Sequence, residues 1–339
     1  MNLSKLSAIL ANEPKYRFVQ VNQAVFQNYI SSWDEVSNLP KNLREKLTAE
    51  CPLEIKAEIY RTAGRQPSEK ALLTLSDGEV VETVLIRQKD RRHTVCVSSQ
   101  IGCALGCLFC ATGNFGFRRN LSAEEIVEQV IFWQRYLKAE DQSVENQDKV
   151  DNVVFMGMGE PFLNYPQFIK AAKFLNNPET MNIGSRRLSV STAGLTEGIK
   201  RLAGEKLQIN LAVSLHAPND NLRRDLMPIA KKYSLRDILA AVDQYINKTN
   251  RRVMFEYLMI KEVNDNEKDA LELAALMKKP LYIVNLIPYN PTGRFAPSTR
   301  ERIDKFKKIL EDNGVAVTVR LSFGADIAAA CGQLRGKKG

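Results

Sequence analysis

The sequence predicts an α/β protein with a small helical domain at its N-terminal end, and three observations lead to this prediction. Before Cys51 the patterns are helical, and a hairpin pattern follows. From Thr94 onward strand-like and helical runs alternate, which is typical of a parallel sheet with right-handed crossovers. Six or seven such units can form a full barrel, a partial barrel or an open doubly wound sheet, and periodicity does not choose among them.

The N-terminal domain is predicted from apolar residues that recur at three- and four-residue spacing. The segments with this spacing are Leu3–Leu10, Phe18–Ile30 and Leu43–Cys51. Pro14 and Pro40 separate them. We predict that this accessory domain extends over residues 1–70.

A short linking hairpin is predicted over residues 71–92. Two strand-like runs, Ala71–Leu75 and Val80–Ile86, flank the dipeptide Asp77-Gly78, which is a strong signal for a tight turn.

The remaining chain, residues 93–339, is predicted to be the main domain. Its expected strands are Thr94–Ser98, Val153–Met156, Leu188–Ser191, Ile209–Leu215, Val253–Met259, Tyr282–Ile287 and Val315–Leu321. Two helix starts carry a capping-box pattern, Ser122 with Glu125 and Ser298 with Glu301. In such folds ligands bind at the carboxyl ends of the strands.

Composition narrows the classes of function. The chain has 44% hydrophobic and 26% charged residues, lacks an apolar run long enough to span a bilayer and begins without a signal-peptide pattern, so we expect a cytoplasmic protein. The net charge of +9 suits a polyanionic partner. With only His93 and His216, a His-rich metal site or a serine-type triad is poorly supplied.

The cysteine pattern is the most informative feature. Three of the six cysteines, Cys103, Cys107 and Cys110, are spaced C-x3-C-x2-C in one loop after a predicted strand. Cysteine thiolates bind iron–sulfur clusters and zinc, but a structural zinc ion needs four ligands. We therefore predict a four-iron cluster with one open iron. The alternative is a zinc site with Cys96 as the fourth ligand.

Seven ordered motifs resemble the radical S-adenosylmethionine (radical SAM) superfamily and, more narrowly, the RlmN/Cfr family of RNA adenine methyltransferases. They are CVSSQIGC at 96–103, FCATG at 109–113, MGMGEP at 156–161, SVST at 189–192, SLH at 214–216, NLIPYN at 285–290 and DIAAACGQL at 326–334. The resemblance extends from about Glu82 to the end of the chain. It implies a partial (β/α)6 radical SAM barrel, and an RNA-binding role for the helical domain.

The resemblance also implies the cofactors and the residues that hold them. Cys103, Cys107 and Cys110 would bind a 4Fe-4S cluster whose open iron binds S-adenosylmethionine, which is cleaved to a 5′-deoxyadenosyl radical. Two S-adenosylmethionine molecules would be used in each turnover. The residues implied to contact this cofactor are Gly159, Glu160, Ser191, Ser214, Leu215, His216 and Asn290.

Three further residues receive catalytic roles from the resemblance. Cys331 would accept a methyl group and then be crosslinked to the RNA through it. Cys96 would release the product by thiol–disulfide chemistry, which requires it to lie near Cys331. Glu82 would be the proton acceptor. Cys51 matches no family motif, and we expect it to be structural.

The family's substrates divide it into two branches. RlmN-type members methylate C2 of an adenine in the peptidyl-transferase centre of 23S rRNA, and some also methylate the adenine 3′ of the tRNA anticodon. Cfr-type members methylate C8 of the same rRNA adenine and confer antibiotic resistance. Pro161 is more like the first branch. A zinc-stabilised, non-catalytic RNA-binding protein is the remaining alternative. We expect a monomer with a flavodoxin- or ferredoxin-type electron donor and no membrane partner.

Basic residue pairs are candidates for contacts with RNA phosphates. Arg186–Arg187 and Arg251–Arg252 precede strands and are expected on the face away from the site. Arg118–Arg119 and Arg223–Arg224 follow site motifs, so we predict phosphate contacts there. The tail from Arg335 to Lys338 is a further candidate.

Overall fold

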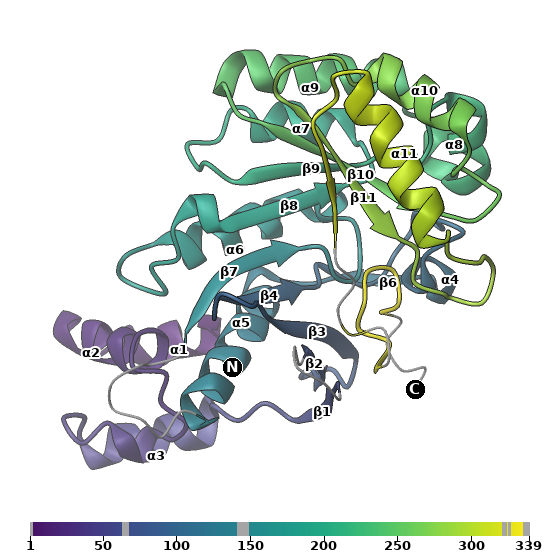
Figure 1. Ribbon diagram of the computed structural model, residues 1–339. Helices are drawn as coiled ribbons and strands as arrows, with labels where there is room; N and C mark the ends of the chain where they lie inside the picture. Colours follow the sequence, from purple (N-terminus) through teal and green to yellow (C-terminus); the bar gives the residue numbers. More distant parts are fainter. Residues whose placement is uncertain (1–2, 63–67, 141–148, 321–323, 325–326, 335–339) are drawn as a thin grey trace.

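The computed structural model describes residues 3–62, 68–140, 149–320, 324 and 327–334, and its centre is one curved sheet (Figure 1). The described strands of this sheet lie in the spatial order β1-β2-β3-β4-β7-β8-β9-β10-β11-β12. Their bounds, in that order, are Ala57–Arg61, Ser68–Thr74, Val80–Arg87, His93–Val97, Val150–Phe155, Leu188–Thr192, Asn210–Ser214, Val253–Met259, Tyr282–Pro288 and Val317–Val319. Two short strands, β5 (Gln100–Gly102) and β6 (Phe117–Asn120), pair separately.

The strands from β4 to β12 pair in parallel, whereas β1, β2 and β3 add an antiparallel extension beyond β4. Among the described residues β1 and β12 do not pair with each other, so the sheet curves without closing. This confirms the partial barrel. β10 has the bounds predicted from the sequence, Val253–Met259.

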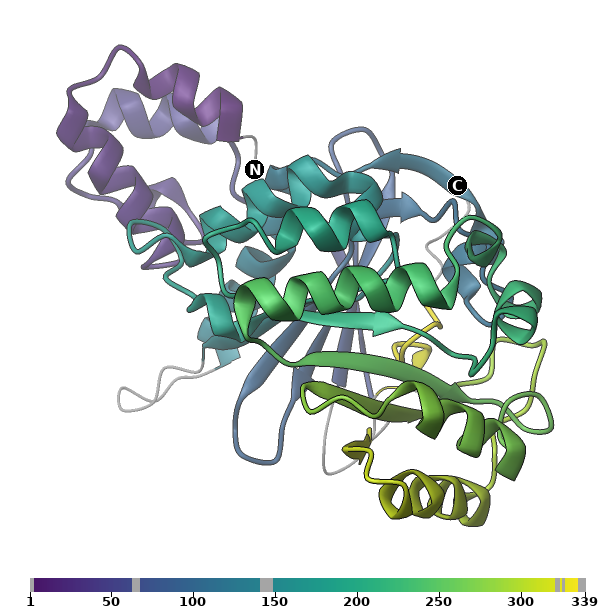
Figure 2. The same cartoon turned by 90° about the horizontal axis from the view of Figure 1, so that it is seen from above.

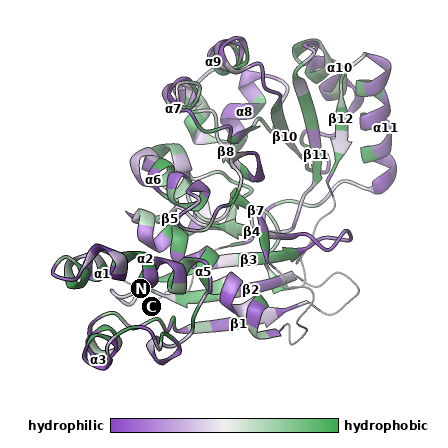
Figure 3. Cartoon of the chain, turned by 90° about the vertical axis from the view of Figure 1, so that its left-hand side faces the viewer, coloured by the Kyte–Doolittle hydropathy of each residue, from purple (hydrophilic) through white to green (hydrophobic). Residues whose placement is uncertain are grey.

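Helices cover the outer face of the parallel strands, as the view from above shows (Figure 2). They are α5 (Ala123–Glu140), α6 (Tyr165–Asn176), α7 (Thr196–Leu202), α8 (Asp220–Leu226), α9 (Leu235–Thr249), α10 (Glu267–Leu276) and α11 (Arg300–Asp312). Hydrophobic residues lie along the central strands, and hydrophilic residues lie on the outward helix surfaces (Figure 3). No helix in the described part of the chain is both long and apolar enough to cross a membrane.

Strand β1 was not predicted from the sequence. It lies within residues 1–70, where only helices were expected, and it pairs antiparallel with β2. Four of its five residues are exposed, so it lacks the alternation of apolar and polar residues that identifies a half-buried strand.

The N-terminal helices end well before β1. They are α1 (Leu3–Leu10), α2 (Lys15–Phe26) and α3 (Lys41–Glu50). Trp33 is buried between them, and its indole N–H donates to the carbonyl of Cys51 at 2.9 Å. Cys51 is itself fully buried, in agreement with a structural role. Side chains of α5 tie this part to the sheet, since Arg135 donates to the carbonyl of Leu53 at 2.7 Å.

One of the two predicted capping boxes forms. Glu125 accepts from the backbone N–H of Ser122 at 2.8 Å, and the Ser122 hydroxyl accepts from the N–H of Glu125 at 3.2 Å. The prediction for Ser298 is wrong by one residue. Thr299 caps α11, while the Ser298 hydroxyl donates to Asp265 at 2.7 Å.

Candidate active site

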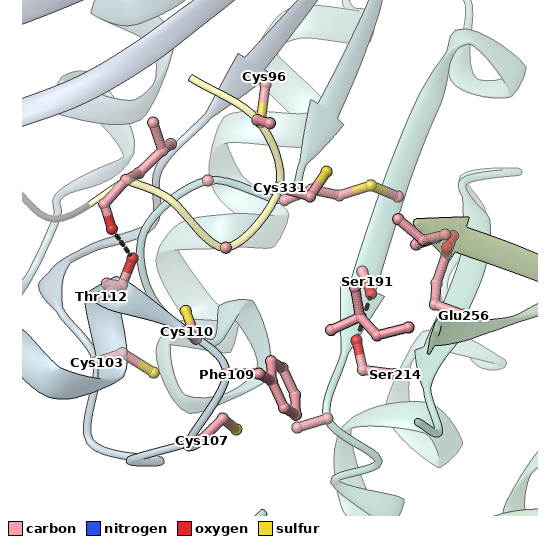
Figure 4. Close-up of a pocket in the computed structure, with 18 of the residues that line it drawn as sticks. Cys96, Cys103, Cys107, Phe109, Cys110, Thr112, Ser191, Ser214, Glu256 and Cys331 are labelled. Atoms are coloured by element: carbon pink, nitrogen blue, oxygen red, sulfur yellow. Dashed lines mark hydrogen bonds between the residues drawn. The ribbon is translucent and has the colours of Figure 1, made fainter. Parts of the chain in front are cut away.

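A pocket of about 200 Å³ lies at the carboxyl ends of the parallel strands (Figure 4). Two segments border it: the cluster loop, residues 103–110, and the C-terminal segment, residues 327–334. The predicted site residues that line it are Cys96, Cys103, Cys107, Cys110, Gly159, Glu160, Ser191, Ser214, His216, Asn290 and Cys331. Leu215 and Glu82 are buried but do not line the pocket. The structure thus gathers residues that are distant in the sequence.

The cluster loop is held by a close approach of two backbones. Gly102 has a φ of +74°, and a Cβ atom there would lie 1.7 Å from the carbonyl oxygen of Gly116. The N–H of Cys103 donates to that same carbonyl at 2.8 Å. β5 and β6 enter and leave the loop as a pair, and α4 (Ala111–Phe115) begins directly after Cys110. Only glycine fits at position 102.

The three loop cysteines suit an electron-poor metal group. Burial, with a smaller contribution from Cys110, raises the pKa of the Cys103 thiol to about 12 and that of Cys107 well above its ordinary value. Thiolates gathered here need a positive partner, which iron supplies. Within the described residues, no three His, Cys, Asp or Glu side chains converge closely enough to hold a single metal ion. Three cysteine side chains on one loop are the donor type that iron–sulfur clusters use.

The turn after β7 presents Glu160 to the pocket. Gly159 has a φ of +98°, and a Cβ atom there would lie 2.6 Å from the side chain of Gln100. The Glu160 carboxylate accepts from the N–H groups of Ala193 at 2.7 Å and Phe162 at 3.0 Å. Burial nevertheless raises the pKa of Glu160 to about 7. This group is poised to ionise when a cationic ligand, such as an ammonium group, binds beside it.

His216 is neutral and fixed. Its Nδ1 accepts from the N–H of Leu258 at 3.2 Å, so the proton of the neutral ring resides on Nε2. Burial, with a smaller contribution from Arg223, lowers the pKa of His216 to about 3. The ring packs edge-on against Phe109 of the cluster loop, with centroids 4.8 Å apart. His216 thus links the β9 end to the cluster loop.

Two neighbouring serines face the pocket beside an acidic residue that the sequence analysis missed. The hydroxyls of Ser191 and Ser214 lie 3.3 Å apart. Glu256 is the register partner of Ser214 and also lines the pocket. One of its carboxylate oxygens accepts from Asn285 at 2.9 Å, whereas Oε1 has no hydrogen-bond partner among the described residues. The signal that could have identified Glu256 is its charge within the otherwise apolar strand Val253–Met259.

The C-terminal segment places Cys331 at the pocket. Asn290 donates to the carbonyl of Cys331 at 3.3 Å, and the N–H of Ala111 donates to the carbonyl of Gly332 at 2.7 Å. The hydroxyl of Thr112 donates to the carbonyl of Leu334. These three contacts dock the segment onto the start of α4 and onto the loop that follows β11.

Cys96 lies at the same end of the pocket as Cys331, opposite the cluster cysteines (Figure 4). Burial, with a smaller contribution from the neighbouring Cys331, raises the pKa of Cys96 to about 12. Arg320 also lines this end, and it acts in the opposite direction by lowering the pKa of Cys96. The sequence analysis did not single out Arg320. Cys96 and Cys331, the two pocket thiols outside the cluster loop, are thus neighbours beside a cation.

Glu82 is buried in β3, beneath the pocket. Its carboxylate forms an ion pair with Lys70 at 3.6 Å, and its carbonyl accepts from the Ser98 hydroxyl at 2.6 Å. Glu82 is only 3% exposed, so it is not an ordinary surface glutamate of a strand.

One predicted phosphate contact is wrong. Arg223 is fully buried, and its guanidinium donates to the carbonyls of Ala193 at 2.6 Å, Tyr233 at 3.1 Å and Leu215 at 3.2 Å. It therefore joins the loops that follow β8 and β9. Arg224, its neighbour, is exposed.

The other basic pairs are also placed by the structure. Arg118 pairs with Glu79 at 2.8 Å, and Arg119 pairs with Asp77 at 2.6 Å. These carboxylates partly neutralise that pair. Arg186 and Arg187 lie just before β8, at the opposite end of the strands from the pocket, as expected. The tail 335–338 lies outside the described residues.

Comparison with known proteins gives consistent similarities over nearly the full chain. The model of the radical SAM superfamily matches residues 97–274. A probable dual-specificity RNA methyltransferase RlmN of Dictyoglomus thermophilum is 46% identical over 95% of this chain and 91% of its own length. The ribosomal RNA large subunit methyltransferase N of Nitrosopumilus maritimus is 44% identical over 95% of this chain and 92% of its own length.

A solved structure has the same architecture. The radical SAM methyltransferase from Sphaerobacter thermophilus superposes with a TM-score of 0.91 at 43% identity, over 99% of this chain and 98% of that one.

Proposed function

Because the chain belongs to the radical SAM superfamily, and within it to the RlmN family of RNA methyltransferases, we propose that it methylates C2 of an adenine in the peptidyl-transferase centre of 23S rRNA. The adenine 3′ of the tRNA anticodon is proposed as a second substrate, in line with the dual specificity in the relatives' names. Membership of the superfamily implies a 4Fe-4S cluster and S-adenosylmethionine as cofactors.

The observation that carries this proposal is the pair of thiols outside the cluster loop. Cys96 and Cys331 come from opposite ends of the main domain, yet both line the pocket that the cluster cysteines border. A binding protein stabilised by zinc has no use for this second pair. A methyl carrier and a resolving thiol need this placement.

Each residue has a defined task in the proposed reaction. Cys103, Cys107 and Cys110 would hold the cluster, whose chemistry with S-adenosylmethionine supplies a 5′-deoxyadenosyl radical. Seven residues would orient the cofactor: Gly159, Glu160, Ser191, Ser214, Leu215, His216 and Asn290. Glu160 is suited to the amino group of S-adenosylmethionine because a cation beside it favours its carboxylate form.

Cys331 would take the methyl group of one S-adenosylmethionine, losing its thiol proton and leaving S-adenosylhomocysteine. A second S-adenosylmethionine, cleaved to methionine and 5′-deoxyadenosine, would supply the radical chemistry that removes one hydrogen atom from that methyl group, so that its carbon can bond to adenine C2 while one electron returns to the cluster. Glu82 would accept the proton that leaves C2. Attack of the Cys96 thiolate on the Cys331 sulfur would break the bond between sulfur and methylene carbon. The disulfide would form as the released carbon takes up a proton to become the product methyl group.

The electron donor in this proposal is a flavodoxin- or ferredoxin-type protein, and the enzyme acts as a monomer in the cytoplasm, where ribosomal RNA is modified.

Mass spectrometry of nucleosides tests the proposal. Deleting the gene should abolish 2-methyladenosine in 23S rRNA and, for the second substrate, in tRNA. Loss of 8-methyladenosine would instead assign the enzyme to C8 chemistry. No change in either nucleoside would contradict the proposed function. Iron and sulfide analysis after anaerobic purification is a second check, since stoichiometric zinc without labile sulfide would exclude the radical mechanism.

A further inference from the structure

Lys70 in β2 is a buried lysine that the proposed reaction does not use. It is only 8% exposed, although a lysine is normally left in solvent because removing its ammonium from water is costly. Its ammonium forms the ion pair with Glu82 at 3.6 Å. It lies near the ring of Tyr60 as well, 5.6 Å from its centroid. The contacts that compensate its burial are therefore specific.

The second polar contact of Lys70 is to the C-terminal segment. Its ammonium donates to the carbonyl of Ala328 at 3.2 Å, three positions before Cys331. Gly324, which precedes this segment, also lies close to β2, since a Cβ atom there would be 3.5 Å from that of Ser68. One ammonium thus touches both the strand that carries Glu82 and the segment that carries Cys331.

The C-terminal segment has anchors on both sides of Cys331. Those at and after Cys331 come from Asn290 and from the start of α4. Among the described residues, Lys70 supplies the side-chain anchor that precedes Cys331. A loop held at both ends has fewer conformations than one held at a single end. The position of the Cys331 sulfur therefore depends on Lys70.

We propose that Lys70 is a positioning residue, which ties the Cys331 segment to β3 at Glu82 and so fixes the methyl carrier relative to the proton acceptor. This inference rests on the proposed function for the roles of Cys331 and Glu82. The tether itself rests only on the contacts of Lys70.

Hydrogen exchange of the C-terminal segment tests the tether without any turnover. In the cluster-loaded protein, Lys70→Met should speed amide exchange in residues 327–334 by about tenfold or more. Lys70→Arg keeps the charge and should retain most of the protection. Lys170→Met is the matched control, since it removes a lysine from an exposed ion pair with Glu124 at 2.8 Å. Unchanged exchange in Lys70→Met would overturn the proposal.

The rate of Cys331 methylation, measured by protein mass spectrometry, distinguishes the contact of Lys70 with Ala328 from its ion pair with Glu82. With S-adenosylmethionine present, Lys70→Met should methylate Cys331 about tenfold more slowly, whereas Glu82→Gln should methylate it normally because the bond from Lys70 to Ala328 remains. Both variants should form little RNA product. Normal methylation in Lys70→Met would show that Lys70 serves Glu82 alone, and would overturn the tether.

A folding defect is the obvious complication, because removing the lysine of a buried ion pair destabilises a fold. The double variant Lys70→Met/Glu82→Gln removes both charges and should still exchange faster than Glu82→Gln alone. Equal exchange in these two proteins would also contradict the tether. If the wild-type protein itself never acquires a methyl group on Cys331, the proposed function fails, while the exchange comparison still decides the role of Lys70.

Discussion

Burial sets the charge of the groups around the pocket. It raises the pKa of Glu160 to about 7 and that of Cys96 to about 12, and it lowers the pKa of His216 to about 3. Each shift favours the neutral form. An iron group or a sulfonium ligand brings positive charge, so its binding favours the thiolates and the carboxylate together. Ligand binding in the pocket therefore promotes ionisation of Glu160 and of the buried thiols.

His216 makes folding stability depend on pH in a defined direction. Its folded pKa, about 3, lies below the ordinary value of 6.5, so the unfolded chain binds a proton more readily as the pH falls. This contribution to stability is present above pH 6.5 and is lost as the pH falls toward 3. In the middle of that window the loss approaches about 1.4 kcal/mol per pH unit.

Urea unfolding of the wild type and of His216→Asn, in the same cluster state, measures this effect. Asparagine suits the left-handed backbone of position 216, whose φ is +58°. The variant should lose stability less steeply than the wild type as the pH is lowered from about 6.5 to 4.5. Parallel slopes would mean that His216 is not buried in its neutral form.

Cys96 offers a direct check on the resolving step. Cys96→Ala should still attach RNA to Cys331 but should not release it, because no thiolate is present to attack the Cys331 sulfur. A covalent adduct of protein and RNA should therefore accumulate on denaturing gels. Cys51→Ala, which changes a buried thiol outside the pocket, is the control and should form no adduct. Release of methylated RNA by Cys96→Ala would contradict the assigned role.

The sequence predicted the thiols but not the groups that surround them. Cysteine spacing is local, so the cluster ligands were visible in one loop. Glu256 and Arg320 act only through a pocket that several strands create. Arg223 was misassigned because a basic residue in a helix near the site is as compatible with RNA contact as with three buried carbonyls. The hydrogen-bond partners of Arg223, which are distant in the sequence, decide between these two roles.

At the level of elements, the cluster loop depends on the close contact between Gly102 and Gly116. Gly102→Ala would place a methyl group against the carbonyl of Gly116, and the strained φ adds to this cost. We expect it to lower the iron and sulfide bound per protein after anaerobic reconstitution by more than half, as measured by colorimetric analysis. Gly314→Ala is the matched control, since position 314 also has a positive φ, +77°, but open space around it. Equal losses in the two variants would show that strain alone explains the effect.

Buried parallel strands were the easiest elements to predict. β10 is almost wholly buried, and its run of apolar residues, interrupted only by Glu256, gave its bounds. The exposed β1, and the short β5 and β6, have no such run and were missed. The box at Ser298 failed because that hydroxyl bonds to Asp265, a tertiary contact, and the helix begins one residue later. The local pattern of apolar residues therefore identified the elements whose residues are regularly buried.

At the scale of the whole molecule, the parallel sheet has two ends with different tasks. The carboxyl ends of its strands hold the pocket, the cluster loop and the C-terminal segment. α8 follows β9 at this end, and its last residue, Leu226, accepts from the N–H of Leu108 in the cluster loop at 3.0 Å. Arg252 lies at the other end, directly before β10. A polyanion that reaches the pocket must therefore approach the end that carries α8.

Arg224 on α8 and Arg252 are both exposed and differ mainly in which end of the sheet they occupy. If RNA binds over the pocket, Arg224→Glu should weaken RNA binding by about tenfold or more and reduce the slope of log affinity against log salt by about one. Arg252→Glu should change both quantities less, because only the long-range field of the net charge of +9 is altered there. RNA titrations at several salt concentrations measure both quantities. They use protein prepared without cluster and S-adenosylmethionine, so that no turnover occurs. Equal effects would mean that RNA binds through the net charge of the molecule and is not directed to the pocket.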